Sequence, residues 1–367
     1  MYNAVKGFVK KNTVLTIAVI CAVITACIVK PDRQYLSYFD LKTLTCLFCV
    51  LAVVCALKNI SFFLILAHKI VRLFKNTRAG ILALVYITFI GSMLIANDMA
   101  LLTFLPLGYL VLSTTGKEKY MAFTFIMQNI AANLGGMLTP FGNPQNLYLY
   151  TKFEIDNMEF MGIMVKPFLL AVLMITLLCL IMVKPEPFEI ADDSVKLDRC
   201  KCILYSALFV LAIAIVFRGI PYYCGLVIPV VLFFVDRKAL RMVDYPLLLT
   251  FTAFFVFSGN MARIELVREI FSSLLERSTL LFSVISCQFI SNVPTAILLS
   301  QFTDNYQALL IGVNIGGVGT IIASLASLIT LREFQKHYPK KVGSYLGEFS
   351  LINFSFLSIL TLGALLV

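Results

Sequence analysis

The feature that most constrains this chain is a series of long apolar segments that recurs along its 367 residues. Each is about 17 to 22 residues long, which an α-helix needs to cross a hydrocarbon core of about 30 Å. The segments between them leave no room for a soluble domain. Hydrophobic residues make up 60% of the chain and charged residues 14%, whereas a soluble domain carries about 25% charged residues. The sequence therefore predicts an all-α polytopic membrane protein.

The net charge of +10 does not indicate a nucleic-acid partner, because Lys and Arg lie in short loops between apolar segments. The positive-inside rule explains these loops better. Most of the ten cysteines lie inside apolar segments, where a free thiol behaves as a small hydrophobe, so no disulfide framework is expected. Only two histidines occur, and a histidine-based metal site is not expected.

The N-terminus is expected in the cytoplasm. Its first eleven residues carry three lysines and no acid, and an apolar run, Asn12 to Val29, follows them. Counting the later runs gives about nine spans and two re-entrant hairpins, with the C-terminus outside. The expected location is the plasma (inner) membrane of a bacterium.

Two stretches carry apolar residues at helical spacing on one face and charged residues on the other, at 61–78 and 262–278. Both are predicted to be amphipathic helices at the membrane surface. Arg263 and Arg268 belong to the second stretch, and we expect them to lie at a solvated interface.

The stretch ANLGGMLTPFGNPQN, Ala132 to Asn146, cannot continue as an unbroken helix, because three glycines and two prolines crowd into it. In hydrocarbon, an opened helix is tolerated only where its freed backbone groups line a protein-walled cavity or a ligand. This stretch is therefore a predicted site.

Two other runs are interrupted by polar residues. The run 79–112 is too long for one span and contains Asn97 and Asp98, so it forms either two short spans or a re-entrant hairpin. The run 280–302 is broken at Ser291, Asn292 and Pro294.

These interrupted segments form an internal repeat. Residues 91–104 align with 286–299, which pairs Asn97 with Asn292. Residues 132–139 align with 313–320, and the identical pairs are Asn133 with Asn314, Gly135 with Gly316, Gly136 with Gly317, and Thr139 with Thr320.

The repeat predicts two halves of opposite orientation. The first, 1–190, contains a hairpin at 79–112 and a broken helix at 121–150, and the second, 191–367, contains a hairpin at 280–302 and a broken helix at 307–331. Two spans precede the first hairpin and seven precede the second, so the halves are inverted. Inverted repeats with discontinuous helices are the architecture of secondary transporters, in which half-helix N-termini face anions and freed carbonyls coordinate cations.

Four motifs carry a resemblance to a known superfamily: NDMALLTFLP, NLGGMLTPFGNPQN, FISNVPTAILL and GVNIGGVGTIIASLASL. They resemble the ion-transporter superfamily of citrate-transporter-like proteins, divalent-anion:sodium symporters, arsenite permeases and Na⁺/H⁺ antiporters. The resemblance implies that hairpin tips and helix breaks enclose substrate and coupling cation, and that they move as an elevator against a homodimeric scaffold. Divalent-anion members carry Ser-Asn-Thr at both tips, whereas this chain reads Ala-Asn-Asp from Ala96 and Ser-Asn-Val from Ser291.

The candidate site residues are those at the tips and breaks. Asparagine offers both an amide oxygen and amide donors, and an ionisable residue at membrane depth is usually functional. The predicted substrate-binding residues are Asn97, Asn143, Ser291, Asn292, Thr295, Asn314 and Thr320. The predicted coupling-ion residues are Asp98, Asn97, Asn133, Gly135, Gly136, Asn292, Gly316 and Gly317.

The predicted function is secondary active transport of a small anion, either a di- or tricarboxylate of the citrate type or an inorganic oxyanion, coupled to Na⁺ or H⁺. An arsenite permease or a Na⁺/H⁺ antiporter of the same superfamily is the alternative. A membrane enzyme using Asp98 as acid or base is a different class, and no nucleophile, base and orienting group accompany Asp98. The expected partners are the small anion, the bilayer and a second copy of the chain, and no cofactor or metal is expected beyond Na⁺.

Overall fold

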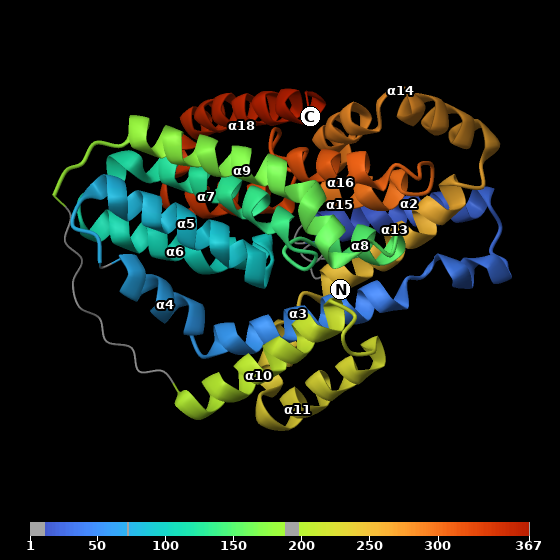
Figure 1. Ribbon diagram of the computed structural model, residues 1–367, viewed down its shortest axis with the longest axis horizontal. Coiled ribbons are helices and arrows are strands. Elements are labelled where there is room, and N and C mark those ends of the chain that lie inside the picture. The colour runs from blue at the N-terminus through green and yellow to red at the C-terminus, as the bar shows by residue number, and fades with distance from the viewer. Residues whose placement is uncertain (1–11, 72, 188–197, 367) are drawn as a thin grey trace.

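The computed structural model describes residues 12–71, 73–187 and 198–366, and these form helices joined by short turns (Figure 1). The described residues contain no strand, and only an isolated bridge joins Asn76 to Pro187. The N-terminal lysines and part of the charged segment around residue 190 lie outside the described residues.

Six described segments are long and apolar enough to cross a membrane. They are α3 (Leu41–Asn59), α5 (Thr77–Ile95), α9 (Asn157–Met182), α10 (Arg199–Val216), α14 (Glu265–Ile290), and η5 with α18 (Pro339–Lys341 and Val342–Leu365). Shorter apolar helices are α2 (Thr13–Ile28), α4 (Phe62–Val71), η4 with α11 (Tyr222–Leu226 and Val227–Val235), α13 (Tyr245–Met261) and α16 (Tyr306–Ile315). The protein is an all-α polytopic membrane protein, as the apolar runs predict.

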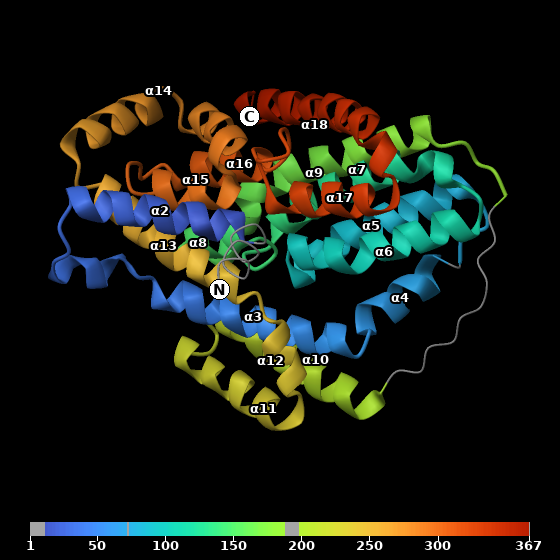
Figure 2. The ribbon, with the colours of Figure 1, turned by 180° about the vertical axis from the view of Figure 1, so that it is seen from behind.

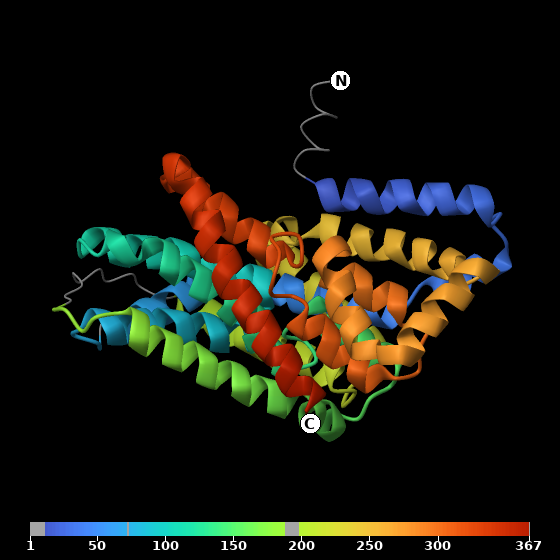
Figure 3. The same ribbon diagram turned by 90° about the horizontal axis from the view of Figure 1, so that it is seen from above.

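The helices form two groups. In the first, α2 packs along α13, and α3 packs against α10 and α12 (Arg237–Met242). Figure 3 shows α2 lying along α13, and Figures 1 and 2 show α3, α10 and α11 below α5 and α9. We call this group the scaffold.

The second group, which we call the core, contains both hairpins and both broken helices. The first hairpin is α5 with α6 (Asn97–Thr114), and α7 (Met121–Gly135) packs against both of its arms. The second hairpin is the C-terminal part of α14 with α15 (Asn292–Leu299), and α16 packs against it. The breaks lead into α8 (Pro144–Lys152) and α17 (Leu325–His337). The halves interlock here, because α15 packs on α8, and α17 packs on α6 and α7.

Each hairpin turns at one residue in a backbone conformation that side chains rarely adopt. Ala96 has φ 64° and ψ 151°, and Ser291 has φ 72° and ψ 158°. These residues directly precede Asn97 and Asn292, the pair that the sequence repeat aligns. The run 79–112 is thus a tight hairpin, and the two hairpins extend from opposite ends of the long axis toward its middle (Figures 1 and 2).

The same contacts join hairpin and break in both halves. Thr139 Oγ1 donates to the Met93 carbonyl at 2.9 Å, and Thr320 Oγ1 donates to the Gln288 carbonyl at 3.0 Å. Gly135 lies against Ser92, and Gly316 lies against Cys287. Because aligned residues make equivalent contacts, the two halves share one local packing scheme. The division at residue 190 stays a prediction.

Each amphipathic stretch is helical over most of its described length, in α4 (Phe62–Val71) and from Glu265 onward in α14. In α4, Phe63, Ala67 and Val71 are buried, while Leu66, which belongs to the predicted apolar face, is 48% exposed. The second stretch is continuous with the second hairpin in α14, with a kink at Ser278, where φ is −166° and ψ is 99°.

The segment after α9 contacts the end of the first hairpin that lies away from its tip. Glu186 pairs with Lys117 at 2.7 Å and with Lys119 at 2.5 Å, and its carbonyl accepts from the Thr77 N–H at 2.8 Å. Hydrogen bonds from the two ammonium groups lower the pKa of Glu186 to about 2. The segment that follows α9 is therefore attached to the core as far as the structure describes it.

Candidate functional site

A cavity of about 280 Å³ lies between the scaffold helices α2 and α13 and the two hairpin tips of the core. The first residues of four helices line it: Asn97 of α6, Pro144 of α8, Asn292 of α15 and Leu325 of α17. Apolar side chains of α2 and α13 form most of the opposite wall, together with Thr250. Because a helix N-terminus carries partial positive charge, the four helix starts make this cavity favourable for an anion.

Local sequence explains why these helices begin at the cavity. Pro144 occupies the first turn of α8, where a missing N–H costs nothing. Ser324 caps α17, and its Oγ accepts from the Ala326 N–H at 3.2 Å. At the tips, the Oδ1 atoms of Asn97 and Asn292 each accept from the N–H of the next residue at 2.9 Å.

Buried amides connect one tip and the two breaks. Asn97 Nδ2 donates to Asn133 Oδ1 at 3.2 Å, and Ser324 Oγ donates to the same oxygen at 2.8 Å. Asn133 belongs to the first break and Ser324 to the second. This oxygen therefore joins the two halves of the sequence.

A second set of hydrogen bonds joins residues of the first break to Asn314 in the second half of the sequence. Asn143 Nδ2 donates to Asn314 Oδ1 at 3.2 Å, and Gln145 Nε2 donates to it at 3.4 Å. Asn314 Nδ2 in turn donates to Asn146 Oδ1 at 2.6 Å. Each break's asparagine thus accepts a hydrogen bond from an N-cap residue of the other half. Ser324, the N-cap of α17, donates to Asn133, and Asn143, the N-cap of α8, donates to Asn314. These reciprocal bonds hold the two breaks together.

Three side-chain oxygens beside this network are buried and accept no hydrogen bond from the described residues: Asp98 Oδ1, Asn143 Oδ1 and Gln145 Oε1. The amide donors of Asn143 and Gln145 are used within the network, so these oxygens are the groups left available. Carboxylate and amide oxygens are the ligands that hard cations prefer.

The predicted site residues fall into three sets. Asn97, Asp98, Ser291 and Asn292 line the cavity. Asn133, Asn143 and Asn314 lie in the hydrogen-bond network and are at least 98% buried. The others make supporting contacts outside the cavity lining: Thr295, Thr320, Gly135, Gly136, Gly316 and Gly317.

The predicted lists omit three polar residues that line the cavity: Gln145, Ser324 and Thr250. Gln145 follows the proline that starts α8, and Ser324 sits at the N-cap position that the repeat assigns to Asn143, so the sequence contained a signal for both. Thr250 lies in the middle of an apolar helix and carries no such signal.

Among the described residues, no Lys, Arg or His lines the cavity, and Asp98 is the only acid that does. No group of three or more His, Cys, Asp or Glu side chains in the described part of the chain could hold a metal ion. Helix N-termini are thus the positively polarised groups that line this cavity.

A many-span helical fold with two breaks and two hairpin tips around one central cavity defines a membrane transport protein. A family described as "Citrate transporter" matches residues 7–310, and the chain belongs to this family. It is 32% identical to an uncharacterized transporter of Methanocaldococcus jannaschii over 79% of this chain and 80% of the relative. It is 28% identical to the inner membrane protein YbiR of Escherichia coli over 74% of both chains.

Proposed function

We propose that this protein is a secondary active transporter of a small carboxylate anion of the citrate type. The observation that carries the proposal is the convergence of the N-termini of α6, α8, α15 and α17 on one cavity that no described cationic side chain lines. Each helix end supplies roughly half a positive charge. Helix ends bind an anion without a fixed salt bridge, which suits a ligand that must also be released.

The coupling ion is proposed to bind beside Asp98. Its Oδ1, with the free oxygens of Asn143 and Gln145, offers acceptors to a Na⁺ ion, and in the absence of Na⁺ the same carboxyl group can carry a proton. A bound cation beside the anion lowers the cost of holding either charge at membrane depth.

The core is proposed to move against the scaffold in an elevator motion. The reciprocal bonds of Asn133 and Asn314 tie both breaks into one unit, whereas α2 and α13 contribute the facing wall of the cavity. A homodimer of the scaffold in the plasma membrane, with the N-terminus in the cytoplasm, completes the proposal. The Escherichia coli relative is described as an inner membrane protein.

The alternatives are weaker. A Na⁺/H⁺ antiporter needs no anion and leaves the four helix N-termini without a role, while an arsenite permease moves an inorganic substrate through the same type of site. A membrane enzyme would need a nucleophile and base beside Asp98, and the described cavity residues supply none.

The test is uptake of radiolabelled citrate into sealed proteoliposomes that contain the purified full chain. Imposed Na⁺ and pH gradients are applied separately. Accumulation against the citrate gradient, driven by one of them, is expected, and Asn292→Ala, which alters the second tip, is expected to abolish it. A vesicle preparation that accumulates neither citrate nor another di- or tricarboxylate under either gradient contradicts the proposal, and accumulation of an inorganic anion alone favours the alternative.

A further inference from the structure

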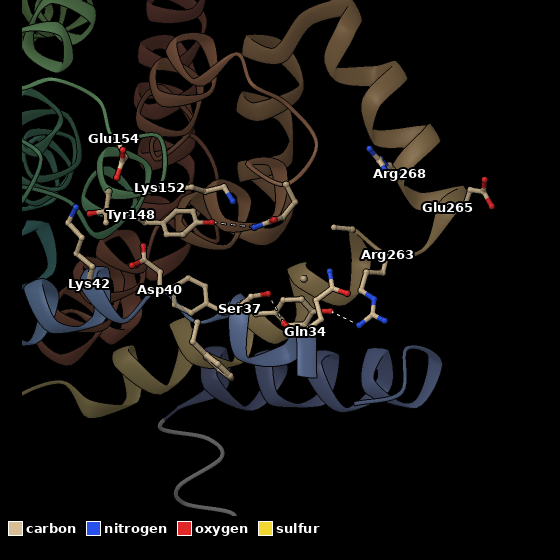
Figure 4. A pocket seen from close by; sticks show the side chains of 17 residues that line it. Gln34, Ser37, Asp40, Lys42, Tyr148, Lys152, Glu154, Arg263, Glu265 and Arg268 are labelled. Carbon is tan, nitrogen blue, oxygen red and sulfur yellow. Dashed lines mark hydrogen bonds between the residues drawn. The ribbon is translucent and has the colours of Figure 1, made fainter. Parts of the chain in front are cut away.

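A second hollow, a polar cleft of about 1020 Å³, lies beyond the central cavity, past the C-terminal ends of α8 and α15. Its walls come from η1 (Arg33–Tyr38) and the start of α3, from the end of α8, and from the junction of α13 and α14. Figure 4 shows this cleft with its polar side chains. None of its lining residues belongs to the central cavity.

Two cationic side chains face the open middle of the cleft from different elements. Lys152 is the last residue of α8, and Arg268 lies in the first part of α14 (Figure 4). Among the described residues, neither forms an ion pair with an acid. Their charges are therefore available to a ligand.

The acids of the cleft are occupied or lie toward its ends. Asp40 caps α3 and accepts from the Thr43 N–H at 2.9 Å. In Figure 4, Glu154 and Glu265 lie at opposite sides of the view, Glu265 at the outer edge beyond Arg268. The cleft therefore offers its strongest attraction to an anion in its middle.

The other arginine of the cleft is already paired. Arg263 binds Asp32 at 2.7 Å and donates to Tyr38 OH at 3.1 Å. The hydrogen bond from the Arg263 guanidinium lowers the pKa of Asp32. Arg263 thus fixes the wall of the cleft, while Gln34 and Gln301 place neutral donors along it.

A buried contact separates the cleft from the central cavity. Tyr148 OH and Ser300 Oγ lie 2.9 Å apart and join α8 to the end of α15. The Tyr148 ring also packs on Phe255 of α13, with ring centroids 5.6 Å apart. The contacts of Tyr148 therefore lie between the cleft and the helix N-termini of the central cavity.

We propose that this cleft is a second anion-binding site, for an anion with two or more carboxylate groups that bridges Lys152 and Arg268. Two carboxylates on one molecule can meet two cations on separate walls, whereas a monocarboxylate satisfies only one. The inference deepens the proposed function, since the anion held here is the one to be transported, but its test measures binding and requires no transport.

The chain contains no tryptophan, so Phe39→Trp places a single fluorescent reporter in the cleft wall. Citrate is titrated into the purified full chain that carries this change, and acetate serves as the monovalent comparison. A saturable response to citrate and none to acetate is expected. Lys152→Gln and Arg268→Gln are each expected to weaken citrate binding about tenfold, the loss of one hydrogen bond to a charged group.

Three controls make the result specific. Arg268→Lys keeps the charge and should keep most of the affinity, Lys166→Gln removes a lysine of α9 outside the cleft and should change nothing, and Asn292→Ala should leave the response intact. The proposal is overturned by the absence of a saturable response, by a response that Lys152→Gln and Arg268→Gln leave unchanged, or by its loss in Asn292→Ala, which assigns it to the central cavity. Citrate binding without uptake contradicts the proposed function alone.

Discussion

At the scale of single residues, the site depends on where polar atoms find partners. Asn133 Oδ1 accepts two hydrogen bonds from different parts of the chain, whereas Asp98 Oδ1 accepts none from the described residues. A buried acceptor without a partner is costly unless a ligand or water satisfies it. The first oxygen therefore stabilises the fold, and the second is available for function.

Asp98→Asn is expected to remove coupling. The amide keeps size and hydrogen-bonding capacity but can neither titrate nor supply a negative charge to Na⁺. Uptake should lose its dependence on the driving ion, leaving at most exchange of internal for external substrate. Citrate uptake and counterflow in proteoliposomes, with and without Na⁺ and a pH gradient, measure this. Concentrative uptake with unchanged ion dependence would show that Asp98 is only structural.

Ser324→Ala is expected to lower the free energy of unfolding by about 1 to 2 kcal/mol, because it removes both the cap of α17 and the 2.8 Å bond to Asn133. Ser327→Ala is the matched control, since Ser327 lies on the same helix and its buried Oγ has no partner among the described residues. Thermal unfolding of the two variants in detergent compares them. Equal melting temperatures would argue against a stabilising role for the Ser324 bond.

At the scale of elements, close helix packing positions the tips and breaks. A Cβ atom added at Gly135 of α7 would lie 2.2 Å from the Phe89 carbonyl oxygen of α5, which is far inside contact distance. Gly135 therefore lets α7 approach the hairpin, whereas Gly136 and Gly142 lie against each other within the break. Packing alone accounts for the glycine at position 135.

Gly135→Ala is expected to destabilise the protein by about 1 to 3 kcal/mol, because backbone atoms must shift to admit the methyl group. Gly162→Ala is the matched control on α9, where a Cβ meets open space and the better helix propensity of alanine should stabilise by up to about 1 kcal/mol. Melting temperatures should therefore move in opposite directions. A Gly135→Ala protein as stable as the natural one would remove the packing explanation.

At the scale of the whole molecule, the two sequence halves do not form two separate bodies. α2 packs on α13 and α3 packs on α10, so the scaffold takes helices from both halves, and the core interlocks through α8, α15 and α17. The end of each hairpin that lies away from its tip contacts the helix that follows the break in the other half. His337 at the end of α17 stacks on Tyr109 of α6, and Tyr148 of α8 bonds Ser300 beyond α15.

This arrangement predicts that Lys152 and Lys340 lie on opposite sides of the membrane. Lys152 ends α8 near the base of the second hairpin, and Lys340 follows α17 near the base of the first. Single cysteines at these positions, in a background whose accessible native cysteines are replaced, should react with an impermeant maleimide from opposite sides of oriented vesicles. Labelling of both from one side would rule out the inverted arrangement.

The sequence by itself determined the fold class and the breaks, because these follow from local chemistry. The run 79–112 alone was compatible with two short spans as well as a hairpin, and its alignment with 280–302 favoured the hairpin. Apolar length sets a span, and glycine and proline open a helix wherever they stand. The pairing of Asn97 with Asn292 and of Asn133 with Asn314 could also be found by aligning the chain with itself. The repeat could have extended this pairing to Asn143 and Ser324.

Only the tertiary structure decided which polar residues face the cavity and which hold the fold. Asn97 and Asn314 have the same chemistry and both take part in the amide network, yet only Asn97 also lines the cavity. Thr250 enters the site because α13 of the scaffold faces the tips across the cavity. The cleft with Lys152 and Arg268 likewise exists only once segments more than a hundred residues apart meet. Such meetings depend on long-range packing, which no local pattern encodes.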